Sequence, residues 1–405
     1  MPASEPDPVE DPSDDPALDA LIHRADLDGL VHAIDADCAT GDWAGLLRLR
    51  DRARSAVGSG RQLWPAATLA EYRLALWAPA EWAAEVLDED GGRFTIGPLT
   101  EVVAVHHTFA DLAIFVPPGP RLGFIAHERA LRGEEIDPDA LAALGVPEVF
   151  DIPLQLQPWE PAYVLATYTD DGVTADPPPR PAGRPVAQPP RDDSPARTAP
   201  PGSVAQPPRD DSPVPVPAEL DGGFDRIGTI RRPQGVHPQP NRHVEDRQRT
   251  AVELAPVVED AAVELATRQL LDAWTASSNG RAEVVCVEGR AADAVARLGV
   301  RGAVLVPLDA REAFAWLAWA GASGGAHGRR RGAALGRFGA WWLVAALGDA
   351  LEEWPLAPDD VGEIATELRW WWWDAGEPPL GWELQLAVED PAEGYAWAIS
   401  AHDAD

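Results

Sequence analysis

A proline-rich stretch in the middle of the chain limits what the whole sequence can fold into. Residues 176–243 hold few large apolar side chains and contain the decapeptide VAQPPRDDSP twice, at 186–195 and at 204–213. Such a composition cannot bury a core and favours extended polyproline II backbone. We therefore predict a disordered linker between two folded parts. The functional alternative is that this stretch is a proline-rich ligand for an aromatic groove.

The predicted organisation is multidomain. The acidic N-terminus is poor in large apolar residues, as a disordered tail is, while the regions on either side of the linker carry the periodic apolar patterns of folded domains. We expect a disordered acidic tail at 1–17, a helical domain at 18–175, the linker at 176–243 and an α+β domain at 244–405.

The N-terminal part has the spacing of successive amphipathic helices. Leu27, Leu30 and Ile34 recur at helical intervals, and a turn at Thr40-Gly41-Asp42 opens a second helix at Trp43. Further helices are expected at 65–87, broken at Pro79, and at 98–115 and 122–132. This pattern predicts an all-α array of antiparallel helices, with 150–169 as an extended strap across it.

The C-terminal part alternates strand and helix patterns. AEVVCVEG at 282–289 and GAVLVPL at 302–308 read as strands around a short helix, which predicts a right-handed parallel pair. Three later segments follow at hairpin spacing: RWWWWDAG, GWELQLAVED and GYAWAIS. Alternation of apolar and polar residues in the middle one indicates one buried face. We therefore expect an α+β domain with a small mixed sheet.

Composition excludes several classes of activity. All 33 basic residues are arginine, so the chain lacks the lysine that P-loop NTPases, protein kinases and pyridoxal enzymes require. The formal net charge of −33 disfavours nucleic acid as a partner.

The sequence also bears on compartment. Cys38 and Cys286 lie in different halves, which argues against a disulfide framework. The acidic, proline-rich N-terminus is unlike a signal peptide, and the longest apolar run, 338–348, is shorter than the roughly 20 residues of a membrane span. We expect a cytoplasmic protein with no membrane partner and two reduced thiols.

An arginine-rich segment, SGGAHGRRRGAALGRF at 323–338, is the main candidate site. Its glycine-rich start leads into a helix N-terminus, where free N–H groups and the helix dipole favour an anion, and arginine adds bidentate recognition of phosphate or carboxylate. The predicted ligand-binding residues are Gly324, Gly325, His327, Gly328, Arg329, Arg330, Arg331 and Arg337. The alternatives are ion pairs with the local acids Asp349, Glu352, Glu353, Asp359 and Asp360, or a partner surface.

Other features have structural interpretations that we favour. Gly332, Gly336 and Gly339 form a small-residue stripe that predicts close helix packing. In a strand, alternate members of the run Trp370–Trp373 face opposite sides, so two belong to the core and two are expected under a helix or the linker rather than in a ligand groove.

Two further patterns suggest chemistry only weakly. Gly321–Gly325 satisfies G-x-S-x-G around Ser323, with His327 nearby. A nucleophile elbow requires a strand before the motif, however, and the pattern before Gly321 predicts a helix. His106-His107 and His127-Glu128 lack a metal-ligand spacing. We expect no metal and no cofactor.

The stretches WLAWAGASGGAHGRRRGAALGRFGAWW and ELRWWWWDAGEPPLGWELQLAVEDP resemble a family of uncharacterised proteins from GC-rich bacteria. The resemblance covers mainly 280–405. It implies a recurrent module and no particular activity.

We consider two functions. The first is a non-catalytic binding or scaffold protein, whose C-terminal module recognises a small anionic ligand or whose helical array binds a protein partner. The second is an enzyme acting on a phosphorylated or carboxylated small molecule, with the arginine-rich helix as an anion clamp. A deep pocket in which Arg330, Arg337 and His327 converge with an acid would favour the enzyme. The sequence identifies no catalytic residue.

Overall fold

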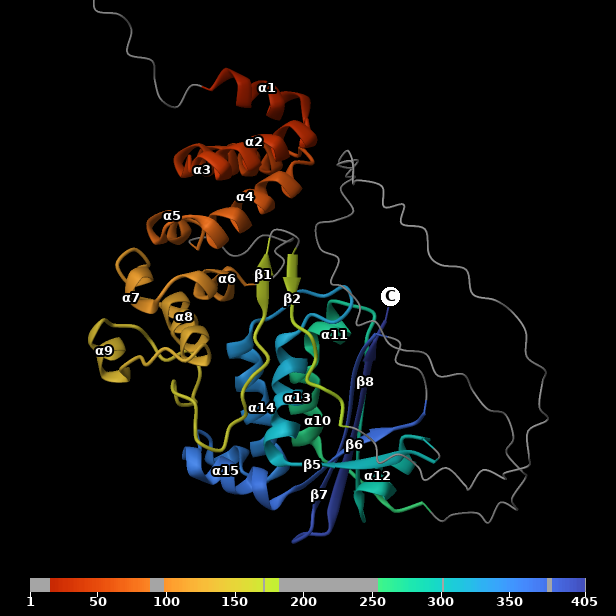
Figure 1. The fold of residues 1–405 in the computed structure, drawn as a ribbon. Helices are drawn as coiled ribbons and strands as arrows, with labels where there is room; N and C mark the ends of the chain where they lie inside the picture. The colour runs from red at the N-terminus through yellow and green to blue at the C-terminus, as the bar shows by residue number, and fades with distance from the viewer. Residues whose placement is uncertain are drawn as a thin grey trace, which may run out of the picture.

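A computed structural model describes residues 15–87, 98–169, 172–181, 254–300, 302–376 and 381–404 (Figure 1). Most of the predicted tail and linker lies outside these residues. The N-terminal elements are α1 (Pro16–Arg24), α2 (Leu27–Thr40), α3 (Trp43–Gly58), α4 (Trp64–Trp77), α5 (Ala80–Glu85), α6 (Leu99–His106), α7 (Phe109–Leu112), α8 (Pro120–Leu131), α9 (Pro138–Ala143), β1 (Thr167–Thr169) and β2 (Gly172–Thr174).

The helical character of the N-terminal part is confirmed. Gly41 ends α2 at a φ of 71°, and the Asp42 carboxylate then accepts the Gly45 N–H at 2.8 Å to begin α3. The predicted helix at 98–115 is instead two helices. His107 is extended, and the Thr108 hydroxyl accepts the Asp111 N–H at 3.1 Å, which caps α7 as a new helix.

The C-terminal elements form a sheet with helices around it. They are β3 (Val257–Val258), α10 (Ala261–Leu270), α11 (Asp272–Ala276), β4 (Arg281–Glu288), α12 (Ala291–Arg297), β5 (Val304–Leu308), α13 (Ala310–Ala322), α14 (Ala333–Leu347), the 3₁₀ helix η2 (Leu351–Glu353), α15 (Pro358–Glu367), β6 (Arg369–Asp374), β7 (Trp382–Asp390) and β8 (Tyr395–Asp403).

The α+β class is confirmed, but the mixed sheet and its parallel pair are wrong. The strand order is β3-β4-β8-β7-β6-β5, and every pairing between these neighbours is antiparallel. The strands β4 and β5 do run in the same direction, but they are separated. In the sheet, β8, β7 and β6 lie between β4 and β5. These three strands follow one another along the chain and pair as antiparallel neighbours.

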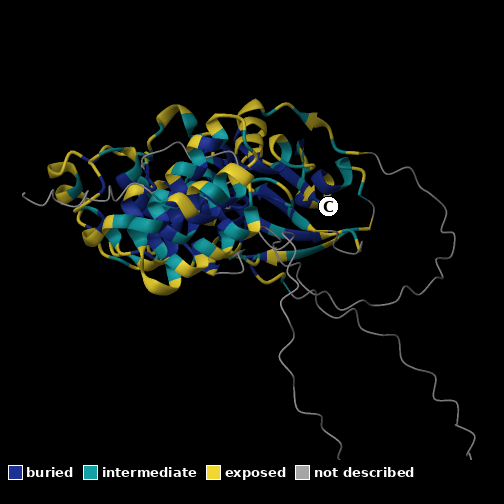
Figure 2. Cartoon of the chain, turned by 90° about the horizontal axis from the view of Figure 1, so that it is seen from above, coloured by how far each residue is buried: buried dark blue, intermediate teal, exposed yellow. Residues whose placement is uncertain are grey.

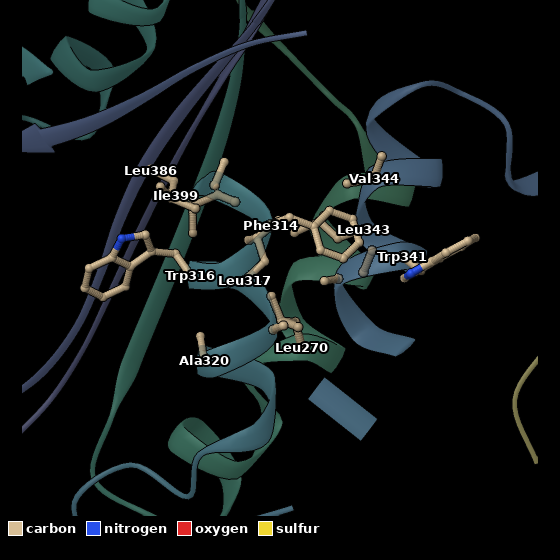
Figure 3. Packing of buried hydrophobic residues seen from close by; sticks show 14 of the residues in the cluster. Leu270, Phe314, Trp316, Leu317, Ala320, Trp341, Leu343, Val344, Leu386 and Ile399 are labelled. Carbon is tan, nitrogen blue, oxygen red and sulfur yellow. The ribbon is translucent and has the colours of Figure 1, made fainter. Parts of the chain in front are cut away.

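The sheet is covered on both faces. Trp370 and Trp372 lie in the large core that α13 and α14 complete, while Trp373 belongs to a smaller cluster with Val295 of α12. Figure 3 shows α13 between the sheet and α14, with Trp316 near Leu386 and Ile399. The predicted alternation of the tryptophan run is therefore present, with indoles buried on both faces.

Buried residues run through the interior of the molecule (Figure 2), where the helical array has a core cluster of its own and the C-terminal core extends into the N-terminal part. Leu131 of α8 and Phe150 pack in the same cluster as α13 and α14. The strap predicted across the helical domain also reaches the C-terminal part. Its Trp159 ring lies 5.0 Å from Trp341, and its indole N–H donates to the Pro358 carbonyl at 3.0 Å.

No helix in the described ranges is both long and apolar enough to cross a bilayer. Cys286 is buried and Cys38 is half-buried, and neither forms a disulfide.

We predict that the two parts stay associated after the chain between them is cut. A protease site inserted between 195 and 204 would be cleaved, and size-exclusion chromatography in native buffer should return one complex containing both fragments. The shared core and the buried contacts between α8, the strap and α14 are the physical reason. Elution of two separate folded fragments would contradict this arrangement.

Candidate functional site

The N-terminus of α14, where we expected an external anion, is occupied by two glutamates of the N-terminal part. The Ala333 N–H donates to Glu101 Oε1 at 3.2 Å, and the Ala334 N–H donates to Glu128 Oε1 at 2.8 Å. Glu101 comes from α6 and Glu128 from α8, and both are buried. The free N–H groups and the dipole of the helix therefore bind carboxylates from the same chain.

Arg330 completes this arrangement. Its Nε and Nη2 both donate to the Glu101 carboxylate at 2.8 Å, as a bidentate pair. The Tyr168 hydroxyl donates to the same carboxylate at 2.6 Å. A cation near a helix N-terminus is unfavourable, and Glu101 offsets it. The guanidinium that we expected to bind an external anion is buried against this glutamate.

Arg337 lies within α14 and has a different internal partner, Glu160. Its Nε and Nη2 donate to the two Glu160 oxygens at 2.7 Å each. The same guanidinium donates to the Pro153 carbonyl at 2.7 Å, and the Trp341 indole donates to Glu160 at 2.9 Å. Arg337 and Glu160 have fully buried side chains. The strap is thus attached to α14 through a satisfied ion pair.

The glycine loop before α14 is shaped around another carboxylate. The Ala326 N–H donates to Asp403 Oδ2 at 2.6 Å. Gly325 has a φ of +71°, and a Cβ there would lie 2.1 Å from the same oxygen. A Cβ on Gly324 would lie 2.3 Å from the Gly328 carbonyl oxygen. These glycines are required for close packing within the loop.

The remaining predicted residues are spread around this loop. His327 is exposed, and its backbone N–H donates to Ser278 Oγ at 2.9 Å. Arg329 is half-buried and has its own contacts. Arg331 lies in a groove on the side of α14. Arg330, Arg337 and His327 therefore bond to three different groups and do not converge.

Sequence reasoning anticipated ion pairing but not the partners. The local acids such as Asp349 are not the residues that meet Arg330 and Arg337; distant glutamates are. The signal that could have revealed them is a charged residue at a buried position of an apolar helical pattern. Glu101 in LTEVVAVH and Glu128 in the apolar run of α8 both have this character.

The two glutamates at the α14 terminus differ in charge state. Burial alone would raise the pKa of Glu101, but the charge of Arg330 and the hydrogen bonds of Arg330 and Tyr168 outweigh it and leave that pKa lowered. Burial raises the pKa of Glu128 to about 7, and the Glu101 carboxylate adds to the rise. Glu101 thus holds the charge, and Glu128 titrates near neutral pH.

Other candidates from the sequence have structural roles. Ser323 is buried, accepts the Trp274 indole N–H at 2.8 Å and follows helix α13, so it has no nucleophile-elbow geometry. A Cβ on Gly336 would lie 2.2 Å from the Ala318 carbonyl, which confirms the close packing of α13 on α14. Gly332 is different, because it caps α14 at a φ of +96°.

The histidines of the two candidate pairs, His106-His107 and His127, lie in the helical part. His106 stacks on Trp77 with ring centroids 5.6 Å apart. His127 is buried against Phe150, and burial lowers its pKa to about 3, with Arg337 nearby adding to the effect. We assign neither of them a chemical role.

A groove of about 530 Å³ lies between α10 and α14. It is lined by Arg268, Gln269, Asp272, Arg331, Phe338 and Trp342. Phe338 and Trp342 stack on each other with centroids 6.3 Å apart, and both are half-buried. Arg331 donates to the Gln269 carbonyl at 2.9 Å. We call this the α10–α14 groove.

The protein thus consists of a helical array and an α+β part, and buried ion pairs at α14 join the two parts. A family model described as a family of unknown function (DUF6183) matches residues 28–212 and 218–405, so the chain belongs to this family. The match spans both parts, and thus more of the chain than the 280–405 region of the resemblance. No curated protein and no solved structure matches the chain.

We predict unequal effects for two matched substitutions at the α14 terminus. Glu101→Gln leaves the buried Arg330 without its carboxylate, which should cost about 3–5 kcal/mol of unfolding free energy. Glu128→Gln keeps one acceptor oxygen for the Ala334 N–H and removes a group whose ionisation opposes folding, but its amide nitrogen then faces Arg132 Nη1, which donates to Glu128 Oε2 at 2.8 Å. Its loss of unfolding free energy at pH 8 should therefore be clearly smaller than that of Glu101→Gln. Equal losses in both variants would contradict this assignment.

The raised pKa of Glu128 also predicts that the unfolding free energy depends on pH. The pKa of Glu128 rises from an ordinary 4.5 to about 7 on folding, so its contribution to stability is complete below 4.5 and is lost as the pH rises through about 7. The lowered pKa of His127 acts in the opposite direction up to its ordinary value of 6.5, so the quantity to measure is the difference in unfolding free energy between the unmodified protein and Glu128→Gln, by chemical denaturation from pH 4.5 to pH 8. That difference should decline as the pH rises, and a difference that does not change with pH would exclude Glu128 as a source of pH dependence.

Proposed function

We propose that this chain is a non-catalytic binding protein and that the α10–α14 groove is its small-molecule site. The observation that carries the proposal is that Arg268 and Arg331 line the same groove as the aromatic side chains of Phe338 and Trp342. Its volume is within the range of about 300–1,000 Å³ that is typical of ligand sites. Aromatic walls with a few polar groups are the usual composition of such a site.

The ligand that this chemistry fits is a flat ring carrying a carboxylate or a phosphate. The rings of Phe338 and Trp342 offer stacking surface. Arg331 is half-buried, and burial lowers its pKa while Asp272 opposes the shift. An anionic group beside Arg331 would therefore replace part of the lost hydration of the guanidinium. Arg268 is exposed and would add charge at the rim.

Of the arginines expected to bind an anion, this proposal keeps Arg331 and places the site in the α10–α14 groove instead of at the N-terminus of α14. Arg330 and Arg337 already bind Glu101 and Glu160, so an external anion would have to displace a buried carboxylate from each. The enzyme alternative depended on the convergence of these two arginines with His327. We favour binding over catalysis for that reason.

The test is a thermal melt of the full chain with a panel of aromatic carboxylates and nucleoside monophosphates. Adenosine and inorganic phosphate serve as the ring alone and the anion alone. A ligand at 100 times its dissociation constant should add about 2.7 kcal/mol to the unfolding free energy. Arg331→Gln and Trp342→Ala should each remove most of this increment.

The matched control is Arg281→Gln, at an exposed arginine of β4 that does not line the groove. It should preserve the full ligand effect. Stabilisation by inorganic phosphate alone that survives Arg331→Gln, or no effect from any member of the panel, would refute the proposal.

A further inference from the structure

A second surface of the C-terminal part is covered by the chain's own proline-rich sequence. After β2 the chain runs along α13 (Figure 1), and residues 175–181, Ala-Asp-Pro-Pro-Pro-Arg-Pro, are extended there. We call these residues the proline segment. Trp319 of α13 and Trp372 of β6 contact it, and Trp382 of β7 stacks on Trp319. We call these three residues the tryptophan surface.

Three contacts attach the proline segment to this surface. The Trp319 indole N–H donates to the Ala175 carbonyl at 3.1 Å. The Arg180 guanidinium lies over the Trp372 ring, 5.6 Å from its centroid. Arg180 Nη2 also donates to Glu383 Oε2 at 2.7 Å. Pro178, between these contacts, is buried.

The rings of the tryptophan surface are held by one another and by Trp316 as well as by the proline segment. Trp319 and Trp382 are stacked with centroids 5.1 Å apart and an interplanar angle of 16°. Trp372 is braced from below by Trp316, whose centroid is 4.4 Å away. A preformed aromatic surface loses little side-chain entropy when it binds an extended segment.

These contacts are the ones by which proteins recognise polyproline II ligands. Proline removes the backbone N–H and restricts φ, so recognition relies on carbonyl oxygens, ring surfaces and a flanking charge. Here an indole N–H donates to the carbonyl of Ala175, an arginine lies over an indole ring, and the same arginine is paired with an acid. None of the three contacts requires that the ligand be covalently continuous with β2.

The sequence repeats the recognised pattern. Pro-Pro-Arg stands at 178–180 in the proline segment, and it recurs at 189–191 and 207–209 inside the duplicated decapeptide VAQPPRDDSP. The chain thus carries this tripeptide three times, once on the tryptophan surface and twice in the following stretch. This recurrence favours the interpretation that the tryptophan surface recognises Pro-Pro-Arg as a motif. A segment that only bridges two parts of the chain would not need the same tripeptide again.

We propose that the tryptophan surface is a recognition site for extended Pro-Pro-Arg segments, that the proline segment is its resident occupant, and that a Pro-Pro-Arg segment of a partner protein replaces it. Glu383 selects the arginine, and Trp319 fixes the position of the backbone. The resident segment acts as an intramolecular competitor, because a tether of this kind supplies an effective concentration on the order of millimolar. A partner therefore gains access only if it binds more tightly or offers several copies.

The experiment uses the full chain and a fluorescein-labelled peptide of sequence TADPPPRPAG, with binding read by fluorescence anisotropy. The open variant carries Pro178→Ser and Arg180→Ala, which weaken the resident segment and leave the tryptophan surface intact. It should bind the peptide at least about tenfold more tightly than the unmodified chain, because competition from the tethered segment is reduced. Arg180→Ala alone, at a partly exposed side chain, is the milder variant should the double substitution impair folding.

Specificity is tested on the tryptophan surface itself. Within the open variant, Trp319→Phe keeps a ring but removes the indole donor, and Glu383→Gln removes the partner of the peptide arginine. Each should weaken binding by about tenfold, as expected for the loss of one hydrogen bond or ion pair of this kind. Trp342→Phe, in the α10–α14 groove, should leave peptide affinity unchanged. A peptide with alanine in place of its arginine loses both the Glu383 pair and the contact with Trp372, so it should bind more weakly by at least about tenfold.

The outcomes separate the alternatives. Binding of a VAQPPRDDSP peptide that shows the same Trp319 and Glu383 dependence would support the recognition site and identify the chain's own repeats as competing ligands. No binding to either open form, or binding that ignores Trp319→Phe and Glu383→Gln, would overturn the proposal and leave the proline segment as a fixed strap. The control Trp342→Phe keeps this result distinct from any failure of the small-molecule proposal.

Discussion

The structure depends on how the positive charges of α14 are compensated. Arg330 is buried in the loop just before this helix and Arg337 is buried on it, and the helix N-terminus presents free N–H groups beside Arg330. An unpaired buried charge costs several kcal/mol, so α14 can occupy the core only with Glu101 and Glu160 in place. Both glutamates belong to the other part of the chain. The helices α6 and α8 and the strap therefore help to complete the interior of the α+β part.

This compensation decides where ligands can act. The α14 N-terminus, Arg330, Arg337 and the glycine loop are used internally, by Glu101, Glu128, Glu160 and Asp403. The two recognition surfaces that we propose are built instead from aromatic rings next to charged side chains. The α10–α14 groove joins rings with arginines, and the tryptophan surface joins rings with Glu383. Their opposite charges suit different ligands, an anion in one case and an arginine-bearing segment in the other.

The tryptophans show how burial and recognition are combined in one sheet. Trp370 and Trp373 are buried, and their indole N–H groups donate to backbone carbonyls, Trp370 to Ala365 at 2.8 Å and Trp373 to Leu386 at 3.2 Å. Such indoles stabilise the core and have no donor left for a ligand. Trp319 differs, since its donor reaches the Ala175 carbonyl outside the domain core. One residue type thus serves packing in one place and segment binding in another.

The sequence by itself determined the local structure: the α2–α3 turn at Gly41, the break at Pro79, the alternation of Trp370–Trp373, and the close approach that requires Gly336. These follow from backbone geometry and from the period of neighbouring side chains, which a sequence contains directly. It did not determine which strands pair, because β4 and β5 are separated by hairpins that come later in the chain. Nor could it show that Arg330 meets Glu101 across 229 residues. Only the tertiary structure decided that, because a buried charge is satisfied by whichever carboxylate the packing brings within reach, whatever its distance along the chain.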